Sequence, residues 1–277
     1  MSTAVPSTTA HQSRTTTQRR RRSVTPLQRT LRLARFETSM LARQRTTLVT
    51  LLSGPFLVLA LAALSPSASP QALAALAGMG VLVVMSLTTH FAGVMLTVNR
   101  REAQVLKRLR TSELSGGELV TGMYLPLVVV GVLESLAVVG VLAARGGALP
   151  DALGWLPMMT GVLIASVGLV VAGVAVAGLS GNAEKANWAA VPLLVVVSGA
   201  ANMLTVSALP EVARQVLLLF PFASLTDLVA RTSGASVSLA ELPVPVPGEL
   251  VDIALLVVWT LVFAAVAKRL WRWEPRG

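Results

Sequence analysis

The 277-residue sequence contains no cysteine and has few charged residues. Without cysteine the chain cannot form disulfide bonds, thiolate metal sites or iron–sulfur clusters, and it has no thiol nucleophile. Charged residues make up 13% of the chain and hydrophobic residues 54%, whereas soluble domains have about 25% charged residues. Long stretches offer no residues for a polar surface, so the composition predicts a protein embedded in a membrane.

Motifs for nucleotide hydrolysis and for two hydrolase classes are also missing. A Walker A phosphate loop needs a Gly-Lys pair, but Lys107, Lys185 and Lys268 follow Leu, Glu and Ala. Neither an HExxH zinc motif nor a GxSxG nucleophile elbow occurs. We therefore expect that the chain is not an enzyme and binds no cofactor. Any ATP-driven role would need ATP and Mg²⁺ bound by a second subunit.

Six apolar runs are long enough to cross a bilayer as helices. The first, residues 47–64, has 18 residues without a charge and would extend about 27 Å at the rise of an α-helix. The other runs are residues 72–98, 122–144, 155–179, 188–206 and 249–267. The sequence thus predicts an all-α, polytopic integral membrane protein with six transmembrane helices.

The positions of Lys and Arg predict how these helices are oriented. Twenty of the 23 lie before the first run, between the second and third, after the fourth, or after the sixth. Because positive residues near span ends stay in the cytoplasm, both termini are expected there. The net charge of +10 then reflects topology, and we expect no nucleic-acid partner. A cleaved signal peptide is disfavoured, since arginines 19–22 lie too far from the first run.

Two different segments precede the first run. Residues 1–25 are rich in Ser, Thr, Gln and Arg, and they predict a disordered, basic cytoplasmic tail, with binding to lipid headgroups as the alternative to a solvated tail. After residue 25, Leu27, Leu31 and Leu41 fall on one side of a helix that is otherwise basic. We expect this amphipathic helix, with Pro26 in its first turn, to lie in the headgroup plane as an elbow before the first span.

The loop at residues 99–122 separates the second and third runs. Val105, Leu106 and Leu109 form an apolar stripe surrounded by basic residues, which predicts a short helix. Ser115 and Glu118 then predict the start of the next helix. The loop could merely set orientation through its positive charge, or its helix could dock on a partner.

The segment at residues 207–248, before the last run, is too long for a simple turn. Its apolar part, residues 210–220, cannot cross a bilayer and ends at Pro221. We expect short re-entrant or interfacial helices on the outer side, including one over residues 225–231, and then a stiff extended strut at residues 243–247.

Glu134 lies in the middle of the third run. A carboxylate at that depth costs at least a few kcal/mol unless it faces a partner or water, so it should point inward. It is a candidate for the substrate path or for a proton site, and the alternative is a neutral packing group. His90 has no second ligand at metal spacing, so we expect it to be a packing residue and expect no metal site. Small residues four apart in the fourth run allow close helix packing, within one chain or between two.

Three segments of the sequence, taken in their order along the chain, carry a resemblance to known proteins. They are ARFETSMLARQRTTL at residues 34–48, RREAQVLKRLRTSELSGGELVTG at 100–122 and FPFASLTDLVAR at 220–231. Together they resemble the elbow helix, the cytoplasmic loop and the last outer helix of ABC-2 permease subunits, especially the drug- and polyketide-exporting type of high-GC Gram-positive bacteria. Two positions depart from the family pattern, because Gln104 stands in place of Gly and Ser112-Glu113 in place of Thr-Pro.

The resemblance implies a function as well as a fold. Residues 26–277 would form the permease domain, and the helix around residues 102–114 would be a coupling helix that docks on a separate ABC ATPase subunit. The residues implied in coupling are Arg101, Glu102, Leu106, Lys107, Arg108, Leu109, Arg110 and Glu113. Those implied in the outer short helix are Pro221, Phe222 and Asp227. Two permease chains, identical or different, would enclose a path across the bacterial cytoplasmic membrane and export an amphipathic small molecule or a lipid-linked compound.

Two other functions stay open. An ion- or proton-coupled secondary transporter would depend on Glu134, but inverted repeats and a second buried charge are not evident in the sequence. A non-transporting scaffold or immunity-type membrane protein would bind a partner without ATP-dependent flux.

Overall fold

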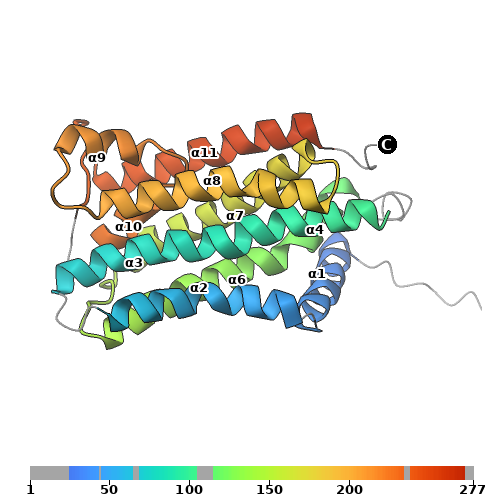
Figure 1. Cartoon of the computed structure of the whole chain (residues 1–277), viewed down its shortest axis with the longest axis horizontal. Helices are drawn as coiled ribbons and strands as arrows, with labels where there is room; N and C mark the ends of the chain where they lie inside the picture. Colours follow the sequence, from blue (N-terminus) through green and yellow to red (C-terminus); the bar gives the residue numbers. More distant parts are fainter. Residues whose placement is uncertain (1–24, 44, 65–68, 105–114, 234–237, 272–277) are drawn as a thin grey trace, which may run out of the picture.

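The computed structural model describes residues 25–43, 45–64, 69–104, 115–233 and 238–271, and within these ranges every regular element is a helix (Figure 1). The elements are α1 (Pro26–Arg43), α2 (Arg45–Ala63), α3 (Pro70–Met85), η1 (Ser86–His90), α4 (Phe91–Glu102), α6 (Gly116–Ala144), α7 (Trp155–Leu179), α8 (Ala183–Leu204), α9 (Glu211–Leu218), α10 (Ser224–Thr232) and α11 (Gly248–Leu270). The predicted all-α fold is confirmed for these residues. The predicted tail at residues 1–25 lies almost entirely outside them.

Five helical stretches in the described part of the chain are long and apolar enough to cross a membrane. They are Pro70–Glu102, Gly116–Ala144, Trp155–Leu179, Ala183–Leu204 and Gly248–Leu270. These stretches overlap five of the predicted runs, and the remaining run, at residues 47–64, coincides with α2, a helix of 19 residues. The chain is therefore a polytopic helical membrane protein.

The long helices run side by side, and the shorter ones lie at the two ends of the bundle (Figure 1). The basic end, as we name it, holds the C-termini of α4 and α11, the N-termini of α6 and α8, and α1, which crosses the direction of the bundle. The capped end, opposite, holds α9 and α10. α7 lies at the centre, in contact with α11, α4, α6, α8 and η1.

Glycines in α7 and α3 let helices approach one another closely. A Cβ atom on Gly173 would lie 2.6 Å from the carbonyl oxygen of His90 and 3.0 Å from the backbone nitrogen of Val94. A Cβ on Gly78 would collide with the carbonyl of Thr226 in α10. Small residues in α7 thus serve packing within this chain, which is one of the two uses that their spacing allowed.

One predicted conformation differs from the structure. Residues 243–247 were expected to form an extended polyproline strut, which has no internal hydrogen bonds. Instead, Val244 N donates to Leu242 O at 2.7 Å, and Val246 N donates to Val244 O at 2.9 Å. Bonds from residue i+2 to residue i are those of γ-turns. Since proline has no N–H, the two valines are the donors of this segment, and each bonds the carbonyl two residues before it.

Candidate functional site

At the basic end, α4 is joined to α1 by an ion pair. The Arg100 guanidinium donates to the Glu37 carboxylate, and the Glu37 side chain is only 3% exposed. Removing the partner of a buried carboxylate strongly destabilises the folded protein. α1 also packs on α6, where Leu33 covers Gly122. The segment that enters α2 is therefore held against the end of α4.

Arg101 and Glu102 join the end of α4 to the connection between α7 and α8. Arg101 is 2% exposed, and its guanidinium donates to Ala177 O at 3.2 Å and to Ser180 O at 2.5 Å. A cation is favourable at this C-terminus of α7, where carbonyls lack helical partners. Glu102 accepts a hydrogen bond from Ala183 N at 2.8 Å, at the N-terminus of α8. Both side chains thus bind helix ends.

The structure brings two of the predicted coupling residues together at the start of the loop. Arg101 and Glu102 hold this point in place, and Arg101 is buried there. The other predicted coupling residues lie outside the described residues: Leu106, Lys107, Arg108, Leu109, Arg110 and Glu113. On the far side of the loop, Ser115 accepts from Glu118 N at 3.3 Å, and its own N–H donates to the Glu118 carboxylate at 2.7 Å. This capping box confirms the predicted helix start.

Gln104 follows the last residue of α4 by two positions and has φ = 54°. Its N–H donates to Arg101 O at 3.0 Å, so the helix ends in a turn with a left-handed residue. Glycine adopts this conformation without a steric penalty, whereas other residues do not. The position where the resemblance leads one to expect Gly in place of Gln104 is therefore one where glycine has a conformational reason to occur.

In the middle of the bundle, Glu134 of α6 meets a π-helical segment. Its Oε2 accepts a hydrogen bond of 2.5 Å from the Thr88 hydroxyl, and Glu134 is 7% exposed. Thr88 belongs to η1, where α3 passes into α4. Oε1 has no hydrogen-bond partner among the described residues. Glu134 points inward, as expected, and π-helical segments often occur at functional sites.

The sequence did not predict η1. Within it, hydroxyl groups bond carbonyls one turn back: Ser86 bonds Leu82 O at 2.7 Å, and Thr89 bonds Met85 O at 2.5 Å. Such bonds compete with the regular helical pattern and bend helices. The sequence signal was the polar stretch of Ser, two Thr and His inside an otherwise apolar run.

At the capped end, Pro221 and Phe222 form the turn before α10. Phe222 has φ = 60° and is fully buried, and its ring stacks on Phe263 of α11 with 5.8 Å between centroids. A left-handed bulky residue costs about 1–3 kcal/mol and persists only where packing holds it. On α7, Gly168 leaves the space that the Phe222 ring fills. The turn is thus built into the core between α7 and α11.

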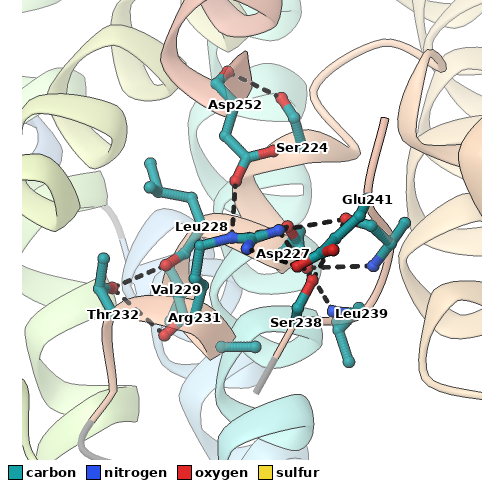
Figure 2. Close-up of polar contacts among 12 residues, drawn as sticks. Ser224, Asp227, Leu228, Val229, Arg231, Thr232, Ser238, Leu239, Glu241 and Asp252 are labelled. Carbon is teal, nitrogen blue, oxygen red and sulfur yellow. Dashed lines mark hydrogen bonds and ion pairs between the residues drawn. The ribbon is translucent and has the colours of Figure 1, made fainter. Parts of the chain in front are cut away.

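Asp227 is the anchor of a polar network at the capped end (Figure 2). Its Oδ2 accepts from Arg231 at 2.6 and 3.2 Å, and its Oδ1 accepts from Leu239 N at 2.5 Å and Ala240 N at 3.3 Å. Burial alone would lower the pKa of the Arg231 guanidinium, but Asp227 raises it above its ordinary value. Asp227 therefore fixes the segment that follows α10 onto that helix.

The expectation that the chain has no second buried charge is wrong. Asp227 is 0% exposed, and Asp252 in α11 is 1% exposed. Asp252 Oδ2 lies 3.7 Å from Arg231 Nε. Sequence reasoning missed Asp252, although it was visible as an acidic residue inside the last apolar run. Asp227 and Asp252 lie at the capped end, Glu37 and Arg101 are buried at the basic end, and Glu134 belongs to the middle of α6.

Comparison with protein families decides which kind of membrane protein this is. A family model described as "ABC-2 family transporter protein" matches residues 61–268. The chain belongs to the ABC-2 transporter family. Two of the three resembling segments, at residues 100–122 and 220–231, lie within the match, and the first, at residues 34–48, precedes it. Comparison with curated proteins gave no match. Membership supports a membrane permease of an ABC transporter, a class of transporter that includes an ATPase partner.

Proposed function

We propose that this ABC-2 permease is the membrane subunit of an exporter in the bacterial cytoplasmic membrane. A separate ABC ATPase subunit binds ATP and Mg²⁺, and this chain neither hydrolyses ATP nor binds a cofactor itself. Two permease chains enclose the path. ATP hydrolysis in the partner drives the export of an amphipathic small molecule or a lipid-linked compound.

Six spans with both termini in the cytoplasm fit the family and the positions of the charges. α2 supplies the span that completes the count, since its 19 residues would extend about 28 Å. Its exposed side chains include Leu52 and Phe56, at 67% and 71% exposed, and such apolar surface suits contact with lipid. The basic end then faces the cytoplasm, a direction that the arginines near its helix ends support.

α1 is proposed to lie in the headgroup layer as an elbow. Its inner side, with Ala34 and Glu37, packs against the bundle. Leu27 and Leu31 lie on one side of the helix and are 68% and 50% exposed, which is the apolar surface that an interfacial helix buries in the membrane, whereas Phe36 is exposed on the opposite side.

The observation that best supports energy coupling is the set of contacts at the root of the loop at residues 105–114. Arg100 binds α1, Arg101 binds the end of α7, and Glu102 binds the start of α8. A displacement of the loop would therefore reach four helices through buried or helix-end contacts, which is how packed networks transmit motion. A loop that only set topology would not need such attachments.

A groove between α6, α7 and α11 supports an amphipathic substrate. It has a volume of about 570 Å³ and lies near the basic end. Its walls are almost entirely apolar, and Thr121 and Lys268 are among the residues that line it. Ligand sites commonly combine an apolar lining with a few polar groups in this way.

The proposal is tested by purifying the tagged full chain from its own host under mild detergent conditions. We expect an ATPase subunit of about domain size to accompany it. Reversing the charges of Lys107 and Arg108 to Glu should release that subunit. The matched control reverses Lys268 and Arg269, two exposed basic residues at the same end, and should retain it.

A chain that purifies alone under these conditions, or a partner lost equally from both charge-reversed variants, would contradict the proposal. Membrane vesicles that contain both subunits should then show ATP-dependent flux. A bound partner without flux would instead favour the scaffold or immunity-type alternative.

Glu134 gives a specific reason to keep ion or proton coupling as a second candidate. The carboxylate is buried, bonded to Thr88 of a π-helical segment, and has one oxygen without a hydrogen bond among the described residues. Under this alternative, replacing Glu134 with Gln would abolish transport while the ATPase subunit stayed bound. A gradient of ions or protons, without ATP, would then drive flux in vesicles.

A further inference from the structure

The carboxylate of Asp252 is buried without the contacts that normally compensate a buried charge. Asp252 lies in the second turn of α11 and is 1% exposed. Among the described residues no N–H or O–H group donates to either of its carboxylate oxygens, and the facing Asp227 carboxylate is the one side chain close enough to share a proton with it. The Ser224 hydroxyl donates to the backbone carbonyl of Asp252 and leaves its side chain unsatisfied. A buried ionised carboxylate is costly unless it is paired and hydrogen-bonded.

The nearby guanidinium is already engaged elsewhere. Arg231 donates to Asp227 through Nη2 and Nε at 2.6 and 3.2 Å, and Nη2 also donates to Ser238 Oγ at 2.8 Å and Ala240 O at 3.1 Å (Figure 2). Its distance of 3.7 Å to Asp252 is that of a loose ion pair and exceeds hydrogen-bonding distance. Arg231 therefore donates hydrogen bonds to Asp227 and none to Asp252.

Negative charge exceeds positive charge around Asp252. Asp227 and Arg231 face it from α10, and Glu249 acts on it from one turn earlier in α11. Glu241, in the segment after α10, lies 3.5 Å from Arg231. In the described part of the chain, the guanidinium that interacts with all four carboxylates is that of Arg231, so one further positive charge would reduce the repulsion between them.

Asp252 is one of the residues that line a cavity large enough for such a charge. The cavity has a volume of about 150 Å³, and Arg231, Glu241, Gly248 and the turns at Val244 and Val246 also line it. A single water needs only about 10–15 Å³ on this kind of measure, so a small ion and several waters fit. Water alone would supply hydrogen bonds but no positive charge.

The donor set selects the class of ion. Among the described residues there is no group of three or more His, Cys, Asp or Glu side chains placed to hold a metal ion. Divalent cations such as Ca²⁺ are bound by several protein oxygens at once. Here one buried carboxylate, a more exposed Glu241 and cavity water are the available ligands. That set suits a weakly held monovalent cation.

We propose that the cavity at the capped end binds a small monovalent cation, with the Asp252 carboxylate as its main ligand and Glu241 at its edge. Asp227 and Arg231 shape the site by holding the segment at residues 238–241 against α10. The site lies at the end of the bundle opposite Arg101 and Glu102. It does not depend on an ATPase partner, so it can be tested on the permease alone.

The test uses the purified full chain and its melting temperature. Choline chloride is replaced stepwise by NaCl or KCl at constant ionic strength and fixed pH, so that only a cation small enough for the cavity changes. We expect the melting temperature to rise and then saturate, because a ligand that binds the folded state stabilises it. The saturable rise should disappear in Asp252→Asn. It should persist in Glu184→Gln, an exposed carboxylate in α8 at the basic end.

Glu241→Gln provides a second variant in case Asp252→Asn does not fold, since the Glu241 side chain is 73% exposed. It should move half-saturation to a higher salt concentration. The proposal is overturned if neither alkali cation raises the melting temperature of the unmodified chain. It is also overturned if Asp252→Asn and Glu184→Gln respond alike, or if the melting temperature follows only pH, which would identify a proton as the occupant.

Discussion

Replacing Arg101 with Met would remove a buried cation from the C-terminus of α7 while keeping much of the side-chain volume. The guanidinium donates to Ala177 O and to Ser180 O, and Ser180 is itself buried. The carbonyls would then lose charge-assisted hydrogen bonds that water could not readily replace, because the site is closed to solvent. The expected result is a less stable chain even when no ATPase is present.

The size of the effect follows from the two hydrogen bonds. Each charge-assisted bond contributes about 1.5–3 kcal/mol, so their combined loss would cost about 3–6 kcal/mol. In a chain of this size 1 kcal/mol corresponds to roughly 2–4 °C in melting temperature. Arg101→Lys keeps the charge but not the planar fork, so it should lose about half of this stability.

The assay is thermal unfolding of the purified chain in one detergent, with Lys107→Glu as the matched comparison. Arg101→Met should lower the melting temperature by roughly 6 °C or more, at the low end of the estimate. Lys107→Glu should leave the melting temperature unchanged and weaken only the capture of the partner. If Arg101→Met has the same melting temperature as the unmodified chain yet fails to capture the partner, Arg101 is a docking residue. Its assignment as a residue that stabilises the end of α7 would then be wrong.

Three further predictions concern other parts of the bundle. Gly173→Ala should lower the melting temperature, since the added carbon meets the backbone of the neighbouring helix. Gly140→Ala should raise the melting temperature, because open space surrounds that position. Equal effects of the two variants would refute the close approach of the helices at Gly173. Gln104→Gly should stabilise the chain by about 1 kcal/mol in chemical or thermal unfolding, and a loss of stability would argue against the left-handed turn. Glu134→Gln should keep partner capture and ATP-driven transport, because the amide oxygen can accept the same hydrogen bond from the Thr88 hydroxyl. A loss of transport with partner capture retained would favour ion coupling.

Helix positions could be predicted because apolar runs and polar breaks are local. The predicted run at residues 155–179 coincides with α7, because non-helical segments with polar residues precede and follow it. Ser115 and Glu118 marked the start of α6 because a capping box uses only residues three apart. The two short outer helices were expected because Pro221 interrupts an apolar segment that is too short to span. These features need no knowledge of the neighbouring helices.

Contacts between distant residues could not be predicted in this way. Arg101 bonds carbonyls that are 76 and 79 residues away, and no local pattern distinguishes this use from docking on a partner. Asp252 lay in an apolar run, but its burial depends on how α10 packs against α11. In the π-helical segment, hydroxyl groups bond carbonyls four residues back, in competition with the helical ladder, and periodicity does not report such bonds.

Three consecutive residues at the end of α4, Arg100, Arg101 and Glu102, reach three different helices. Adding or deleting one residue upstream in that helix would turn all three side chains by about 100° and would break every attachment together. The loop beyond them is under no such restriction from these contacts. Evolution or design could therefore rewrite that loop to suit another ATPase, provided that the length of the helix leading into it is kept.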